Sequence, residues 1–351
     1  MTAQLEVIAS GLAVTLQDRG RFGYRRIGVP VSGALAPVLL AAANALVGNA
    51  ADAVGLEILL SGPVLKVCTG RVRISIAGDV GAQMQSARGA TLRVAPWSTA
   101  TLASGDIIRF GTAALPAAGG LRLAYVGVGG GVEVPAVLGS RSTYTRAALG
   151  GVHGRAIAVG DLLACRGRVD TAPLEFRGGH PFAHPTGPIR VMPGPQTDHF
   201  TDEALQAFFS QPFTVTRDSD RMGMRLDGPA LTHSALGADI ASDGVTPGAI
   251  QVPANGQPII LMADCQTVGG YPKIATVIRA DLSRLAHVRP GMTVRFQRVS
   301  LAEAAAARAV QAQQLALWIG RIASFRPPGL IDEAALYGDN LVSGMIRAEL
   351  G

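Results

Sequence analysis

The feature of the sequence that most constrains the fold is an internal repeat. Residues 18–28 share five identical residues, at one constant offset, with residues 218–228. Two further pairs of blocks follow in the same order: residues 56–58 with 250–252, and residues 105–110 with 291–296. One such match can arise by chance, but three colinear matches indicate a duplication. The sequence therefore predicts two similar domains.

Each copy has the pattern of a β-domain. Glycine (44 residues) and proline (21 residues) are abundant, and both disfavour helix interiors. Short β-branched or alternating segments bounded by Gly or Pro occur at residues 72–77, 121–126, 259–262, 274–278 and 293–296. The sequence therefore predicts a mainly β protein of tandem β-barrel domains with few helices.

The stretch 178–188 is rich in Pro, Gly and His, has no periodicity, and is the predicted domain boundary. We expect an N-terminal β-barrel domain over residues 1–185, a C-terminal β-barrel domain over 186–300 and a helical tail over 301–351. Short helices are predicted at 37–46 and 202–209.

The tail is predicted to begin with a long helix from Ser300 to about Ile322. Ser300 and Glu303 have the spacing of a capping box, in which each side chain bonds the other residue's backbone N–H. Pro327 and Pro328 would end this helix. A terminal amphipathic helix over 331–350 would then pack on a barrel or on a partner.

Charge and cysteine content exclude several classes of protein. The net charge of +6 comes from scattered residues without a basic block, so neither a nucleic-acid arm nor a membrane-binding patch is expected. Three well-separated cysteines without a CxxC pair argue against a disulfide framework and against a structural zinc site. With no signal peptide or membrane span in the sequence, we expect a cytoplasmic protein.

Common catalytic motifs are also missing from the sequence. Leu65 precedes Lys66 and Pro272 precedes Lys273, so neither lysine lies in a phosphate-binding P-loop. Residues 127–132 lead toward Pro135 rather than into the helix that a dinucleotide-binding fold needs. His180 and His184 have the spacing of a metal pair, but the prolines around them favour a solvated linker. No nucleophile elbow or catalytic triad is present.

Four clusters of polar residues and glycine remain, at residues 17–24, 218–223, 242–258 and 264–273. Arginine suits carboxylates and phosphates, glutamine can both donate to and accept from an amide, and glycine lets a ligand approach the backbone. The candidate catalytic residues are Arg221, Gln266 and Lys273. The candidate substrate-binding residues are Asp18, Arg21, Ser32, Gln251, Asn255, Gln257, Thr267, Gly269, Gly270 and Tyr271.

Two of these assignments have a structural alternative. Asp18 and Arg21 can simply tie a turn together by an ion pair. Lys273 can be a surface residue at the start of a strand, although it is one of only two lysines in a chain that otherwise uses arginine. Both alternatives stay open at the level of sequence.

The clusters resemble a known family over nearly the whole chain from Leu5 to about Ile322. The segments 17–24, 31–35, 43–49, 219–223, 248–253 and 266–272 are similar to the biotin-dependent carboxyltransferase family. That family includes allophanate hydrolase subunit 2 or KipA-type proteins, the C subunit of 5-oxoprolinase and the carboxyltransferase region of urea carboxylase. The sequence departs from the family at Ala36, Asp220 and Asp243, where Asp, Asn and Glu are usual.

The resemblance implies tandem cyclophilin-like β-barrels and a separately encoded KipI-type B subunit, with the active pocket where the two chains meet. The leading hypothesis is the C subunit of an ATP-dependent 5-oxoprolinase, inactive without its partners, which uses ATP with Mg and has an A subunit as a further partner. A second is carboxyl transfer from biotin to urea or a related amide. Neither Lys66 nor Lys273 has a biotin-carrier context, so another chain would supply the biotin. A third is a non-catalytic KipA-type regulator that binds a KipI-like partner.

Overall fold

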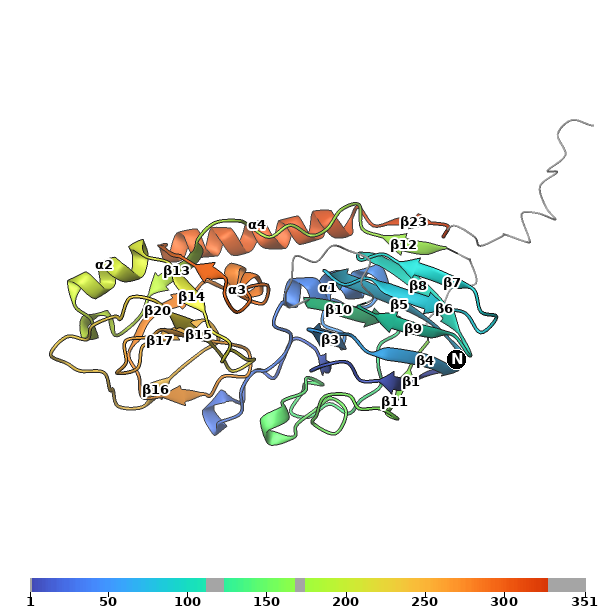
Figure 1. Cartoon of the computed structure of the whole chain (residues 1–351), viewed down its shortest axis with the longest axis horizontal. Helices are drawn as coiled ribbons and strands as arrows, with labels where there is room; N and C mark the ends of the chain where they lie inside the picture. Colours follow the sequence, from blue (N-terminus) through green and yellow to red (C-terminus); the bar gives the residue numbers. More distant parts are fainter. Residues whose placement is uncertain (1, 112–122, 168–173, 328–351) are drawn as a thin grey trace, which may run out of the picture.

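A computed structural model of the chain describes residues 2–111, 123–167 and 174–327 (Figure 1). Within them, strands dominate and four α-helices are found. This confirms the predicted mainly β class with few helices. Two hydrophobic cores lie side by side, one formed by residues up to Cys165 and the other beginning at Ile189.

The first half of the molecule, residues 2–177, wraps two antiparallel sheets around one core. One sheet has the order β11-β1-β4-β9-β6-β7. Its strands are β1 (Ala3–Ala9), β4 (Val64–Thr69), β6 (Ala82–Gln85), β7 (Thr91–Val94), β9 (Ile107–Phe110) and β11 (Leu162–Cys165). The other has the order β2-β3-β10-β5-β8-β12-β23. Its strands are β2 (Thr15–Gln17), β3 (Gly55–Leu59), β5 (Arg71–Gly78), β8 (Ser98–Ala103), β10 (Leu123–Val128), β12 (Glu175–Arg177) and β23 (Ala323–Phe325).

The second half, residues 189–298, forms one eight-stranded sheet in the order β21-β14-β15-β18-β17-β20-β13-β22. Its strands are β13 (Ile189–Pro193), β14 (Phe213–Val215), β15 (Gly223–Asp227), β17 (Ala249–Gln251), β18 (Ile259–Leu261), β20 (Lys273–Val277), β21 (Thr293–Val294) and β22 (Phe296–Arg298). Only Arg295 separates the two outermost strands, β21 and β22, so the sheet is nearly closed on itself as a barrel. A separate ribbon pairs β16 (Asp243–Gly244) with β19 (Val268–Gly269).

The helices begin where local chemistry predicts. Helix α1 (Pro37–Leu46) has Pro in its first turn and is buried on most sides against the second sheet of the first half. Helix α2 (Asp202–Ser210) is capped by the Thr201 side chain. Helix α3 (Arg279–Leu285) follows β20, and α4 (Leu301–Ile319) starts with the predicted Ser300–Glu303 capping box.

The end of α4 corrects the predicted tail. The helix stops at Ile319 rather than near Ile322, and the chain then forms strand β23, which pairs with β12 of the first half. Figure 1 shows α4 running beside the second half toward β12 and β23 of the first. The buried Trp318 at its end packs edge-on against Trp97, with ring centroids 5.5 Å apart. The predicted helix over 331–350 lies outside the described residues.

Two of the three repeated blocks occupy matching structures. Residues 56–58 lie on the buried strand β3, and residues 250 and 251 lie on the buried strand β17, directly before residue 252. Gly105 and Gly291 both have positive φ, 89° and 87°, in the turns before β9 and β21. The first pair differs, because residues 25–27 form the 3₁₀ helix η1 (Arg25–Ile27) whereas residues 223–227 form strand β15. The repeated residues of that pair therefore have different surroundings.

The linker histidine His184 is half-buried, with both ring nitrogens shielded from solvent, which corrects the interpretation of a solvated linker at this position. Its ring packs between Phe182 and His287, with centroids 5.6 and 4.7 Å away. Burial, followed by the nearby His287, lowers the pKa of His184 to about 4. No helix among the described residues is long and apolar enough to cross a membrane.

Candidate functional site

Lys273, at the start of β20, lies at the centre of a polar cluster in the second half. Lys273 is only 4% exposed, which excludes the alternative that it is a surface residue. The ammonium Nζ donates to Oδ2 of Asp243 over 2.7 Å, while the Asp243 side chain itself is 55% exposed. The hydrogen bond from Lys273 is the main cause that lowers the pKa of Asp243. A buried cation thus faces a carboxylate on the exposed β16–β19 ribbon.

Gln251 is placed beside Lys273 by strand pairing. The two residues are Cα partners on the antiparallel strands β17 and β20, where a register shift between Ile250 and Gln251 interrupts the regular pairing. Gln251 is buried and donates from Nε2 to the carbonyl of Tyr271 over 3.3 Å. The amide of Gln266, which is exposed, donates to Oε1 of Gln251 over 3.3 Å. Three predicted site residues therefore converge.

The glycines of this cluster have a steric role. A Cβ on Gly269 would lie 2.5 Å from Nε2 of Gln251, so a side chain there would displace the Gln251 amide. Gly270 accepts a backbone hydrogen bond from Ile240, and the buried Thr267 accepts one from Val245. These contacts hold residues 266–271 against the ribbon strand β16.

Gln196 joins the cluster, although the sequence analysis did not identify it. It lies just after β13, where its Oε1 accepts from the backbone N–H of Lys273 over 3.2 Å. Its Nε2 donates to Oδ2 of Asp243 over 3.5 Å. The signal near Gln196 is Gly194, two positions before it. A Cβ on Gly194 would overlap the Lys273 carbonyl oxygen, so the chain passes very close to Lys273 there. Gln196 bridges both members of the Lys273–Asp243 pair.

Asn255 and Gln257 lie in the turn between β17 and β18 and have local partners. Asn255 accepts from the backbone N–H of Gln257, and the Gln257 amide makes two hydrogen bonds with the backbone of Gly228, each of 3.1 Å. Within the described residues, no hydrogen bond joins either side chain to Lys273 or Gln251. The structure therefore does not bring these two predicted residues into the cluster.

Arg221 lies in a different place, where the two halves meet. Its Nε and Nη2 donate to the two oxygens of Asp264 over 2.8 and 3.1 Å, and Nη1 donates to Glu57 of the first half. A further bond of 2.6 Å goes to the carbonyl of Gly33. Burial alone would lower the pKa of Arg221, but the carboxylates of Glu57 and Asp264 raise it above its ordinary value. We call these three charged residues the Arg221 bridge.

Neutral groups surround the bridge on both sides. Ser32 donates its hydroxyl to Oδ1 of Asp264 over 2.5 Å, and Tyr125 donates to Glu57. The backbone N–H of Leu35 also donates to Glu57, over 2.9 Å. Burial first, and then Glu57, raise the pKa of Tyr125 well above its ordinary value, so this hydroxyl stays a donor. Ser32, a predicted ligand contact, is thus a link between the halves.

Asp18 and Arg21 bind a loop of the first half rather than each other. The Asp18 carboxylate accepts from Ser140, Ser142 and the backbone of Arg141, over 2.7, 2.5 and 2.6 Å. Arg21 is fully buried and donates to the carbonyls of Val137 and Ser142. The expected Asp18–Arg21 ion pair is not found among the described residues. Both residues hold the 137–142 segment in place.

The donor set of the second half suits a small organic molecule better than a metal ion. Among the described residues, no group of three or more His, Cys, Asp or Glu side chains could hold a metal ion. The Lys273 cluster offers instead one ammonium, one exposed carboxylate and three primary amides. Such a set can bind a small molecule that carries both an anionic group and an amide.

Comparison with known proteins places the chain in one family. The sequence model described as "Carboxyltransferase domain, subdomain A and B" matches residues 27–298. The chain is 37% identical over 317 residues to the C subunit of 5-oxoprolinase from Escherichia coli (strain K12), a match that covers 87% of this chain and 94% of that protein.

Solved structures extend the likeness to three dimensions. The crystal structure of TTHA0988 matches with a TM-score of 0.69 and 32% identity, over 84% of this chain and 56% of that one. The K. lactis urea amidolyase matches with a TM-score of 0.77 and 28% identity, over 94% of this chain and 20% of that one. The chain therefore spans about half of the first protein and a fifth of the second.

Proposed function

The chain belongs to the family of carboxyltransferase domains with subdomains A and B, and we propose that it is the C subunit of an ATP-dependent 5-oxoprolinase. It acts with a KipI-type B subunit and is inactive alone. The opening of the lactam ring to glutamate is completed by an A subunit. Similarity to the E. coli protein over 94% of that protein's length supports this activity rather than that of the much longer urea amidolyases.

The observation that carries the proposal is the opposed pair of Gln251 and Lys273. 5-Oxoproline has one carboxylate and one lactam, which is a secondary amide. The Lys273 ammonium has three N–H bonds, and Asp243 accepts one of them, so a substrate carboxylate can take another. The amides of Gln251 and Gln266 can donate to the lactam carbonyl and accept from the lactam N–H.

The reaction needs energy because an unstrained amide is a poor electrophile. ATP supplies it by transferring a phosphoryl group to the lactam oxygen, which converts that oxygen into a leaving group. The residues of this chain hold the substrate for that transfer: Lys273 neutralises the carboxylate, and Gln251 and Gln266 orient the lactam. Gln196 and Asp243 fix the direction of the Lys273 side chain.

We assign ATP and Mg to the junction with the KipI-type partner. The sequence has no P-loop, and the described residues contain no group of ligands for a metal ion. The chain therefore contributes the substrate side of the pocket. On this assignment the whole complex works in the cytoplasm, as the unpaired cysteines suggest.

Turnover by the assembled complex tests the function. The co-expressed subunits should convert 5-oxoproline to glutamate only when ATP and Mg are present. Omission of this chain, or of its KipI-type partner, should reduce the rate to background. Robust ATP-dependent turnover by this chain alone would contradict the proposal.

A second candidate is carboxyl transfer from biotin to urea or a related amide. The TM-score of 0.77 against a urea amidolyase, over 94% of this chain, favours it. Biotin would come from another chain, because neither lysine has a carrier context. Incorporation of labelled bicarbonate into urea, dependent on a biotinylated carrier and absent with 5-oxoproline, would support this candidate. If the chain binds its KipI-type partner and neither reaction occurs, the remaining function is that of a non-catalytic KipA-type regulator.

A further inference from the structure

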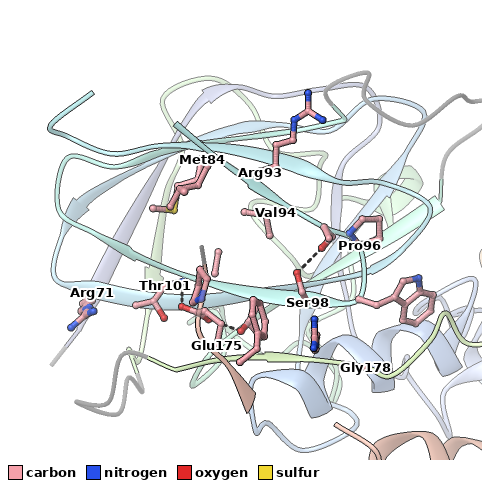
Figure 2. A pocket seen from close by; sticks show the side chains of 17 residues that line it. Arg71, Met84, Arg93, Val94, Pro96, Ser98, Thr101, Glu175 and Gly178 are labelled. Atoms are coloured by element: carbon pink, nitrogen blue, oxygen red, sulfur yellow. Dashed lines mark hydrogen bonds between the residues drawn. The ribbon is translucent and has the colours of Figure 1, made fainter. Parts of the chain in front are cut away.

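The first half contains a cavity that neither the Lys273 cluster nor the Arg221 bridge uses. Its volume is about 390 Å³, and it lies between the two sheets, where β6 and β7 face β8, β12 and β23. Figure 2 shows Met84 and Val94 on one side of it and Thr101 and Glu175 on the other. Strands β7 and β23 are the outermost strands of their sheets, so this is an open side of the first half.

The walls of the cavity are mainly apolar. They are formed in part by Met84, Leu92, Val94, Trp97 and Phe325. The one buried acid, Glu175, already accepts from the Thr99 hydroxyl and from the backbone N–H of Thr101. Its carboxylate is therefore satisfied within the fold, and the walls favour an apolar occupant.

The rim of the cavity is basic. Arg71, Arg93 and Arg177 line it, and all three residues are exposed. The guanidinium of Arg177 lies over the ring of Phe325, 5.3 Å from its centroid. An occupant with apolar side chains and surrounding acidic groups would match both the walls and the rim.

The chain itself leads to this cavity. Strand β23 pairs with β12, and the residues that follow it, up to Pro327, remain at the cavity, because Phe325 and Pro327 both line it. Residues 328–351 lie outside the described part of the chain. Their sequence has four acidic side chains and one basic one, in a chain whose overall charge is +6. Apolar residues occur among them at Leu330, Ile331, Leu336, Leu341, Met345 and Ile346.

We propose that residues 328–351 bind in this cavity of their own chain. The apolar residues of the segment match the walls of the cavity, and its excess of acidic residues matches the basic rim. Because the segment is joined to the rim at Pro327, its effective concentration is in the millimolar range, so individually weak contacts are enough. This inference is independent of the proposed enzymatic activity.

Hydrogen–deuterium exchange on the full-length chain tests it. The double variant Leu336→Ser/Met345→Ser changes only the segment, so the contacts of the barrel stay intact. We expect the amides of residues 91–97 to exchange about tenfold faster in this variant than in the unmodified chain. Strands β17 and β20 of the second half serve as the internal control and should not change.

Reversal of charges, first on the rim of the cavity and then on the segment, adds a second measurement. Arg93→Glu should accelerate exchange at residues 91–97, and Asp332→Arg/Glu333→Arg in the same chain should restore part of the protection. Equal exchange at these residues in the unmodified chain and the double serine variant would overturn the proposal. So would protection that grows with protein concentration, because the occupant would then be the segment of a second copy.

Discussion

Arg21 and Arg221 are matched residues of the internal repeat, and the two halves use them differently. Arg21 is bound by neutral backbone carbonyls of its own half, whereas Arg221 is bound by two buried carboxylates, one from each half. The same divergence occurs at Glu57 and Gln251, the central residues of the second pair of blocks. Glu57 is part of the Arg221 bridge, and Gln251 lies beside Lys273. A repeated sequence can therefore place one residue in a scaffold and its counterpart in the polar cluster that we propose as the binding site.

The largest loss of stability is expected when the two matched arginines are replaced. Arg221→Met leaves Glu57 and Asp264 buried without their cation, which should lower the free energy of unfolding by about 3–5 kcal/mol. Arg21→Met keeps the volume and leaves only neutral carbonyls unpaired, at a cost of about 1–3 kcal/mol. Urea denaturation of the two variants measures the difference. Equal losses would show that the charges of the bridge do not distinguish the two sites.

Two single substitutions test the counterparts Glu57 and Gln251, each of which receives the side chain of the other. Glu57→Gln removes one of the two charges that face Arg221 and should destabilise the chain by about 2–3 kcal/mol. Gln251→Glu gives up the donation to the Tyr271 carbonyl but adds a carboxylate on the strand paired with Lys273, so the loss should be smaller, about 1 kcal/mol. The midpoints of thermal unfolding give the order. The reverse order would contradict the roles assigned to the two strands.

The smallest stability effect concerns the junction of the halves at His184. Its pKa of about 4 in the folded chain lies below the ordinary value of 6.5, so the unfolded chain binds the extra proton. Neutral His184 makes its full contribution to the free energy of unfolding above pH 6.5. That contribution is lost as the pH falls toward 4, and it amounts to about 1–2 kcal/mol after allowance for partial solvent screening. The neighbouring His287 contacts Asp79 over 3.4 Å.

Unfolding at a series of pH values measures this contribution. His184→Phe should flatten the fall in stability between pH 6.5 and 4. His180→Phe, at an exposed position of the same linker, serves as the matched control and should keep the slope. An unchanged slope in the His184 variant would place the pH dependence elsewhere.

Much of the fold could be predicted because its signals are local. Pro37 and the Ser300–Glu303 capping box mark helix starts, and β-branched runs such as residues 274–278 mark strands. Gln251, Gln266 and Lys273 were also named as candidate site residues, because glycine and glutamine concentrate around them. The extension of the long helix past Ile319 was wrong, since the pairing of β23 with β12 depends on residues about 150 positions away.

The parts of the site that were missed depend on contacts between distant segments. Gln196 reaches Lys273 across 77 positions, and Glu57 reaches Arg221 across 164. No local pattern marks Glu57, which lies on an ordinary strand, and the one signal near Gln196 is Gly194, whose close approach to Lys273 only the structure shows. The sequence alone favoured a ligand role for Arg221, and only the bonds to Glu57 and Asp264 show why its loss should first affect stability.

The central claim is that the second half holds the substrate through Lys273, and turnover of the assembled complex tests it most directly. Lys66, the other lysine of the chain, lies on β4 of the first half and provides the matched control. Lys273→Ala should lower ATP-dependent turnover of 5-oxoproline at least tenfold, about 1.4 kcal/mol or more of transition-state binding, while Lys66→Ala should keep it. Near-normal turnover by the Lys273→Ala complex, or equal losses for the two variants, would contradict the account.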